Sequence, residues 1–273
     1  MTRFANYLHY VLPGNDAQVM VLAAKALGRL AIPGGTRTAE FVEFEIKRSL
    51  EWLQGERIES RRHAAALLIG ELGNNAPTLV YTYVPQIFEA IWVVLRDPKV
   101  NIREAASEAL DSCLKLTLQR DSSLRNQWYK KLVEEAYKGF KLGSIESIHG
   151  SLLTFGEMFR HTGLYLQDRY IEICDSIMKY KDHKESLIKK TVINLIPDLA
   201  TFNSTDFSSI YLNTWMNHLL SQLKKEKEKS SGKNNVKLAF IAIGKISLAI
   251  GSALGPFLDP IFASMKEGLS LKL

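Results

Sequence analysis

The sequence predicts an all-α fold, an α-α superhelix built from stacked antiparallel helix pairs. Three observations lead to this prediction. One helix face recurs along the whole chain, a second set of helices with aromatic faces lies between the recurrences, and no long alternating stretch rich in Val, Ile and Thr indicates a strand.

The recurring face consists of a small or apolar anchor with apolar residues three, four and seven positions later. This spacing places the side chains on one side of an α-helix. The anchors are Ala23, Ala65, Ala106, Leu152, Val192 and Ala239, and successive anchors are 42, 41, 46, 40 and 47 residues apart. These periods match the two-helix HEAT unit, so we expect a single HEAT-repeat solenoid of about six helix pairs over residues 1–273.

Each anchor-bearing inner helix follows an outer helix with bulkier side chains. The outer helices are expected at 4–12, 38–53, 83–95, 125–140, 165–178 and 206–223, and the first inner helix at 17–30. Turns are expected at Pro13-Gly14-Asn15, Pro33-Gly34-Gly35, Gly73-Asn74-Asn75, Gly143 and Gly163. A last outer helix at 256–269 has no inner partner after it, so we expect a fragment of a longer solenoid with a right-handed twist and the inner helices on its concave side.

Asp97, Arg103 and Arg62 are predicted to have a structural role. Asp97-Pro98 begins the helix that contains Ala106, and Asp97 can accept a bond from a free backbone N–H there. Arg103 and Arg62 each lie three residues before an anchor. An Asp in the turn and an Arg early in the inner helix can pair within one repeat or between neighbours, so we expect a partial Asp/Arg ladder.

Composition excludes several classes of protein. The chain is 46% hydrophobic and carries a net charge of +6, a modest excess that by itself predicts neither nucleic-acid nor membrane binding. Its apolar stretches are shorter than the roughly 18 residues of a membrane span, and its start lacks a secretory signal pattern, so a cytoplasmic protein without a transmembrane segment is expected. Cys113 and Cys174 lie in apolar helical patterns and are predicted to be buried hydrophobes.

No catalytic, cofactor-binding or metal-binding residues are predicted. A kinase needs a Gly-rich loop, a strand lysine, a His-Arg-Asp loop and an Asp-Phe-Gly site, and only Asp206-Phe207-Ser208 imitates any of these. That tripeptide follows Asn203-Ser204-Thr205 at an expected helix start, so Asp206 and Ser208 are interpreted as caps. The six histidines form no H-E-x-x-H pair. The charged run 224–229 and the polar residues after it are interpreted as a solvated helix end and loop.

Several ordered segments resemble one family. They are Arg3-Phe4-Ala5-Asn6-Tyr7-Leu8, Val42-Glu43-Phe44-Glu45 with Glu51-Trp52-Leu53, Arg61-Arg62-His63-Ala64-Ala65, Gln127-Trp128-Tyr129, Ile148-His149-Gly150 and Lys224-Lys225-Glu226-Lys227-Glu228. Together they resemble the N-terminal HEAT region of the TOR kinases, and the resemblance covers nearly the whole chain.

The resemblance implies a scaffold within a nutrient-responsive Ser/Thr protein kinase that controls growth. ATP and Mg would be bound in a distant kinase domain. The implied partners are a Raptor-like regulatory subunit, a small WD-repeat subunit, a Rheb-type GTPase and the rest of the solenoid, with the complex cytoplasmic or peripheral to the vacuolar or lysosomal membrane. No contact residue can be transferred.

Two alternatives remain open from the sequence. The first is a HEAT scaffold of another protein, such as a transport receptor, a phosphatase scaffold or a translation factor, which would bind peptides along its concave groove. The second is a HEAT-like DNA glycosylase, which requires a concave face lined by Arg and Lys with aromatic residues around an Asp.

Overall fold

The computed structural model describes residues 2–14, 16–32, 34–55, 57–120, 123–224 and 233–270, and every regular element among them is a helix. The all-α prediction is confirmed. The chain divides into two compact units, Met1–Tyr165 and Leu166–Leu273. The charged run at 224–229 lies, apart from Lys224, outside the described residues, as do residues 230–232 after it. The loop predicted to continue to Asn235 is wrong at its end, because α15 begins at Lys233.

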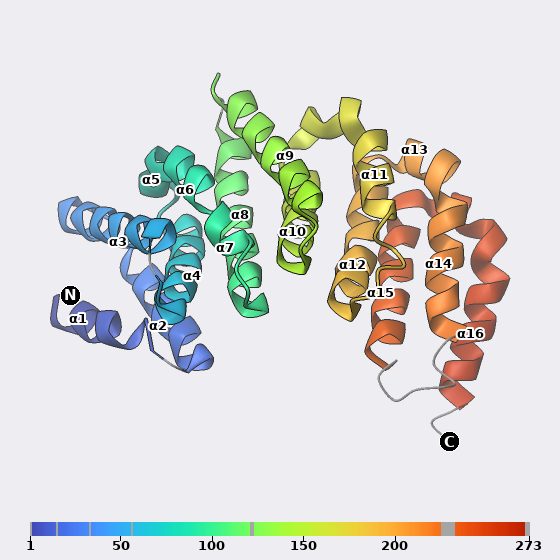
Figure 1. The fold of residues 1–273 in the computed structure, drawn as a ribbon, viewed down its shortest axis with the longest axis horizontal. Coiled ribbons are helices and arrows are strands. Elements are labelled where there is room, and N and C mark those ends of the chain that lie inside the picture. Colours follow the sequence, from blue (N-terminus) through green and yellow to red (C-terminus); the bar gives the residue numbers. More distant parts are fainter. Residues whose placement is uncertain are drawn as a thin grey trace. The chain divides into compact units, whose positions relative to one another are not determined.

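The first unit is a stack of helices in which inner helices contact one another. Its elements are α1 (Thr2–Val11), α2 (Ala17–Leu30), α3 (Thr36–Gly55), α4 (Glu59–Asn75), α5 (Pro77–Val80), η1 (Tyr81–Tyr83), α6 (Val84–Ala90), α7 (Trp92–Leu95), α8 (Val100–Gln119), α9 (Arg125–Leu142) and α10 (Ile145–His161). Helix α4 packs between α2 and α8, and α8 packs against α10 (Figure 1). The outer helices α3 and α9 pack on α4 and α10.

The second unit repeats the arrangement with less regular outer helices. It contains most of η2 (Gly163–Arg169), then α11 (Tyr170–Met178), α12 (Ser186–Phe202), α13 (Ser204–Asp206), the π-helix η3 (Phe207–Tyr211), α14 (Leu212–Lys224), α15 (Lys233–Ile250), η5 (Gly251–Phe257) and α16 (Leu258–Ser270). The inner helices α12 and α15 pack together, and α14 contacts α15 and α16.

The six anchors are the most direct check of the repeat pattern. They lie on α2, α4, α8, α10, α12 and α15, and none is more than 4% exposed. Cys113 and Cys174 are also buried and free, and burial raises the pKa of each thiol to about 12. The apolar periodicity therefore identified the buried face of every inner helix.

The third outer helix differs from its prediction as one helix at 83–95. The structure breaks this region into α5, η1, α6 and α7. Pro77 and Pro85 each occupy the first turn of a new helix. Proline cannot donate a backbone hydrogen bond, so it begins a helix more readily than it continues one. The fifth outer helix also begins later than expected, because Gly163–Arg169 form a 3₁₀-helix.

The turn predicted at Gly73-Asn74-Asn75 is wrong, because α4 remains helical through Asn75. Gly73 is there for helix packing. A Cβ at this position would lie 2.5 Å from the Oγ of Ser112 on α8, which is far inside van der Waals contact. By contrast Gly34, Gly35 and Gly143 adopt positive φ angles of 76°, 86° and 71° in the turns where they were expected.

The kinase-like tripeptide Asp206-Phe207-Ser208 has a structural explanation that differs in detail from the predicted one. The capping residue is Asn203, whose side chain accepts a bond from the backbone N–H of Asp206. Phe207 is fully buried. Its ring belongs to the core of the second unit.

One stretch, Asn235–Glu267, is long and apolar enough to cross a membrane by length and composition, with a mean hydropathy of 1.8 in its most apolar window. The sequence prediction of short apolar runs did not anticipate it. Of that window 28% is buried within the protein. A single such stretch is weak evidence for a span, since the core helix of a soluble protein passes the same test.

Candidate partner-binding groove

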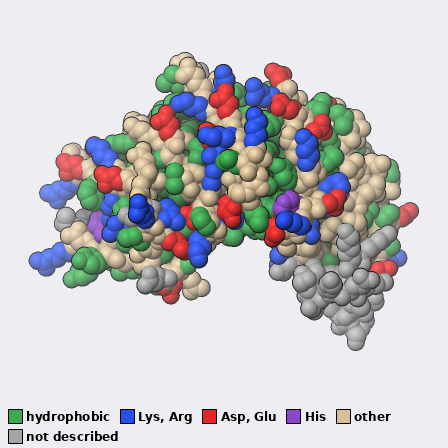
Figure 2. Space-filling model, in the orientation of Figure 1, with side chains coloured by type: hydrophobic (Ala, Val, Ile, Leu, Met, Phe, Trp, Pro, Cys, Tyr) green, Lys and Arg blue, Asp and Glu red, His purple; other side chains and the backbone are tan. Residues whose placement is uncertain are grey.

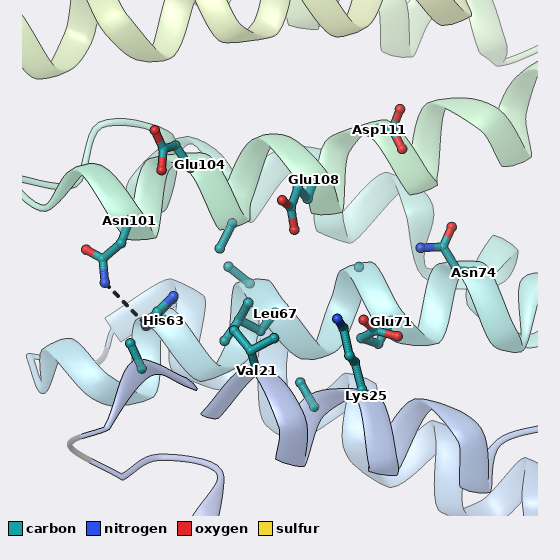
Figure 3. A pocket seen from close by; sticks show the side chains of 15 residues that line it. Val21, Lys25, His63, Leu67, Glu71, Asn74, Asn101, Glu104, Glu108 and Asp111 are labelled. Atoms are coloured by element: carbon teal, nitrogen blue, oxygen red, sulfur yellow. Dashed lines mark hydrogen bonds between the residues drawn. The ribbon is translucent and has the colours of Figure 1, made fainter. Parts of the chain in front are cut away.

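The inner helices of the first unit enclose a groove of about 540 Å³ between α2, α4 and α8. Figure 3 shows it with Val21 and Leu67 at its centre, below α8. Small residues also line it, namely Ala24, Ala66, Gly70 and Ala105. Their size lets another chain approach the helix backbones closely.

A second hollow of about 330 Å³ lies at the end of the groove where α4 and α8 begin. It shares Ala17, His63 and Asn101 with the larger one. The side chains of His63 and Asn101 are 3.5 Å apart, as the dashed line in Figure 3 marks. Burial lowers the pKa of His63, so near pH 7 this side chain is a neutral donor or acceptor. The two hollows are therefore neighbours along the inner helices.

Carboxylates line one side of the groove. Glu104 and Glu108 are exposed on α8, and Glu108 points toward α4, which contributes Glu71 (Figure 3). Among the described residues, no Lys or Arg lies within ion-pair distance of these three side chains. Burial and the nearby carboxylates of Glu104, Glu71 and Asp111 raise the pKa of Glu108, and Lys25 opposes this only in part.

The position of Glu104 and Glu108 opposes folding to a small extent. Like charges four residues apart on a helix destabilise it by roughly 0.2–0.5 kcal/mol. Burial and packing of α8 do not require two acids there, because both side chains are exposed. The residues lining the larger hollow include no Ser, Thr or Cys that could act as a nucleophile. The acidic lining can therefore bind a cationic segment.

The three residues of the predicted ladder lie together beside the groove. Asp97 is 2% exposed, and its carboxylate accepts bonds from the Nε of Arg62 at 2.7 Å and from the backbone N–H of Lys99 at 2.9 Å. Arg103 reaches the same turn differently, because its Nη1 donates to the backbone carbonyls of Asp97 and Pro98. These bonds join α4 to the turn that begins α8 and hold both walls of the groove.

Arg103 also connects α8 to α10. Its Nε donates to the Nδ1 of His149 at 2.9 Å, and both side chains are 1% exposed. Burial, together with the Arg103 charge, lowers the pKa of His149 to about 4. His149 is therefore a neutral acceptor at pH 7.

The depressed pKa of His149 makes stability depend on pH. An unfolded histidine titrates near pH 6.5, so between that pH and about 4 the unfolded chain binds a proton that the folded chain excludes. We expect the free energy of unfolding to fall by about 3 kcal/mol from this residue as the pH drops from 7 to 4. In His149→Gln, which keeps an acceptor for Arg103, the free energy of unfolding measured with urea should fall less steeply between pH 7 and pH 4 than in the parent chain. The same pH dependence in both proteins would contradict the assignment.

The comparisons with known proteins agree with the resemblance seen in the sequence. The chain is 41% identical over 273 residues to the serine/threonine-protein kinase tor1 of Schizosaccharomyces pombe, covering 100% of the chain. It is 39% identical over 279 residues to TOR2 of Saccharomyces cerevisiae, covering 99% of the chain. The chain belongs to the TOR family. This TOR-family chain spans 11% of the length of each of these two relatives.

The fold comparison is consistent with the repeat architecture. A solved structure of the Kap95:Nup1 complex matches 97% of this TOR-family chain and 33% of that chain, with a TM-score of 0.66 and 15% identity. At this identity the likeness is one of fold alone, so it gives no support to a transport function. No family model matches the chain.

Proposed function

We propose that this chain is a protein-interaction scaffold in a TOR-type Ser/Thr protein kinase, and that its groove binds a segment of a partner subunit that bears Lys or Arg. The observation that supports it is the row of Glu71, Glu104 and Glu108, which have no ion pair among the described residues and border an apolar, small-residue floor. A Lys or Arg side chain would satisfy these acids, while its neighbours fill the space over Val21 and Leu67.

The partner we propose is a Raptor-like regulatory subunit. In this proposal the whole protein is a nutrient-responsive kinase, with ATP and Mg²⁺ held in a domain outside this chain, and a Rheb-type GTPase contacts the assembled solenoid. We propose that the complex resides in the cytoplasm or at the vacuolar or lysosomal membrane. Similarity to TOR kinases over the whole of this chain supports a TOR kinase, rather than a transport receptor or a phosphatase scaffold, as the parent protein.

The DNA glycosylase alternative finds no support in the groove. Its lining contains Glu71, Glu104, Glu108 and Asp111 against a single Lys25, which is the opposite charge to that needed by a polyanion. On the face drawn in Figure 2, acidic and basic side chains are interspersed without a broad basic patch.

The test replaces two groove acids in the full-length kinase. Glu104→Gln/Glu108→Gln should reduce recovery of the Raptor-like subunit about tenfold or more, because two charge-assisted bonds are lost. The matched control is Glu40→Gln/Glu51→Gln, which removes the same charge from exposed positions on α3. Recovery and its salt dependence are measured by affinity purification at several ionic strengths.

The outcome separates binding from folding. Removing the repulsion between the two acids should leave the thermal midpoint of the variant unchanged or slightly raised. Equal recovery from the groove variant and the α3 control would reject the groove as the binding site.

A further inference from the structure

A second cluster of chemically active side chains lies where α8 packs against α10. Asp111 comes from α8, and Glu157 and His161 come from α10. One potential ligand atom from each residue lies within 4.8 Å of the other two. Glu157 and His161 are four residues apart, so they share one helix face and converge on the same point.

The carboxylate of Glu157 lacks a partner for one of its two oxygens. The residue is 5% exposed, and its Oε1 accepts a bond from the Oγ of Ser107 at 2.7 Å and lies 3.0 Å from the Nη2 of Arg160. Its Oε2 is buried and has no hydrogen-bond partner. An unpaired oxygen of a buried carboxylate costs free energy unless a positive group or a donor reaches it.

The remaining two ligands are positioned to complete a site. The Nε2 of His161 lies 2.6 Å from the Oδ1 of Asp111, and their side chains are 15% and 21% exposed. Solvent can therefore reach one side of the cluster, while Glu157 closes the other. That arrangement offers three protein ligands and an open position for water.

We propose that Asp111, Glu157 and His161 bind a divalent transition-metal ion, with zinc as the best match. One imidazole nitrogen and two carboxylate oxygens form a ligand set that zinc accepts, whereas Mg²⁺ and Ca²⁺ favour oxygen ligands throughout. Tetrahedral zinc with bonds of about 2.0–2.2 Å needs its ligand atoms about 3.3 Å apart. The observed ligand atoms, 2.6 Å apart for His161 and Asp111 and no more than 4.8 Å apart for any pair, bracket that spacing. The bound ion joins α8 to α10 beside the groove.

Two cations now neighbour the cluster and would compete with the ion. Lys115 lies 2.5 Å from the Oδ2 of Asp111, and Arg160 pairs with Glu157, but these cationic side chains are 47% and 45% exposed. Both cationic side chains reach solvent, so a divalent ion that supplies the positive charge can replace them at the two carboxylates. Neither cation satisfies the Oε2 of Glu157.

The test is a Co²⁺ titration of the full 273-residue chain, freed of tags and treated with a chelator. Co²⁺ reports four-coordinate nitrogen and oxygen ligands through its visible absorption. We expect one equivalent to bind, Zn²⁺ to displace it, and the thermal midpoint to rise on adding Zn²⁺. His161→Ala and Glu157→Gln should each weaken binding at least tenfold.

The matched control is His9→Ala. His9 also lies beside a buried carboxylate, 3.0 Å from Glu45, but among the described residues no third ligand joins that pair. This variant should bind Co²⁺ as the parent chain does. Glu157→Gln should fold, because it removes a buried charge. If it does not, Asp111→Asn on the other helix supplies the same readout.

Absence of a one-equivalent Co²⁺ spectrum would overturn the proposal. So would binding that persists unchanged in His161→Ala and Glu157→Gln, since that would indicate an adventitious ion only. Although Asp111 also lines the groove, the two proposals fail separately, because the groove is tested by variants at Glu104 and Glu108 and the metal site by variants at Glu157 and His161.

Discussion

Replacing Arg103 by Ala is expected to lower the free energy of unfolding by about 3–5 kcal/mol. Arg103 is 1% exposed and donates to two backbone carbonyls and to the ring of His149. Its loss leaves two buried acceptors, the Asp97 carbonyl and the His149 ring, and the part-buried Pro98 carbonyl without this donor, and it opens a cavity at the junction of α8 and α10. The effect is large because one side chain satisfies groups from both helices.

Urea unfolding followed by circular dichroism measures this change. Arg29→Ala on α2 is the control, since Arg29 is exposed and is expected to change stability by less than about 0.5 kcal/mol. A loss below about 1 kcal/mol for Arg103→Ala would show that water replaces the guanidinium, and the proposed importance of this junction would be wrong.

Replacing Gly150 by Ala is expected to destabilise the chain by about 3 kcal/mol, although Ala is the better helix former. A Cβ on Gly150 would lie 2.0 Å from the carbonyl oxygen of Leu95 and 2.9 Å from its carbon. The obstacle is backbone at the end of α7, so it cannot move aside as a side chain would. Helix α10 would have to shift away from α7.

The same substitution at Gly244 on α15 is the matched control. A Cβ there meets nothing within 4 Å, and the position is exposed. Gly244→Ala should therefore stabilise the chain by roughly 0.5–1 kcal/mol. Thermal unfolding of the two variants should shift in opposite directions. A shift of the same sign in both would contradict the steric explanation for Gly150.

Periodicity predicted the inner helices well because burial there depends on spacing within one helix. Ala23 and Ala239 are both buried, as the pattern required. The outer helices were less predictable. The third one, expected at 83–95, begins anew at α6 with Pro85 in its first turn and is interrupted again at Ile91, and the sequence alone did not show these breaks.

The groove and the metal cluster depend on contacts between repeats, which periodicity within a helix does not address. Glu71 and Glu108 come from different inner helices, and the sequence does not fix how α4 and α8 align. The sequence nevertheless contained a pattern that could have predicted some of these contacts. Asp111 and Glu157 each lie five residues after an anchor, and Arg103 and His149 each lie three residues before one. Equal positions in successive repeats stack, so comparing repeats position by position would have found both pairs.

The central claim is that the groove between α2, α4 and α8 holds a partner, and hydrogen exchange of the full-length kinase tests it most directly. Exchange is compared with and without the Raptor-like subunit. The proposal predicts slower exchange in peptides from α2, α4 and α8, since a bound segment limits opening of these helices. Unchanged exchange in all three, with protection elsewhere in the solenoid, would contradict it.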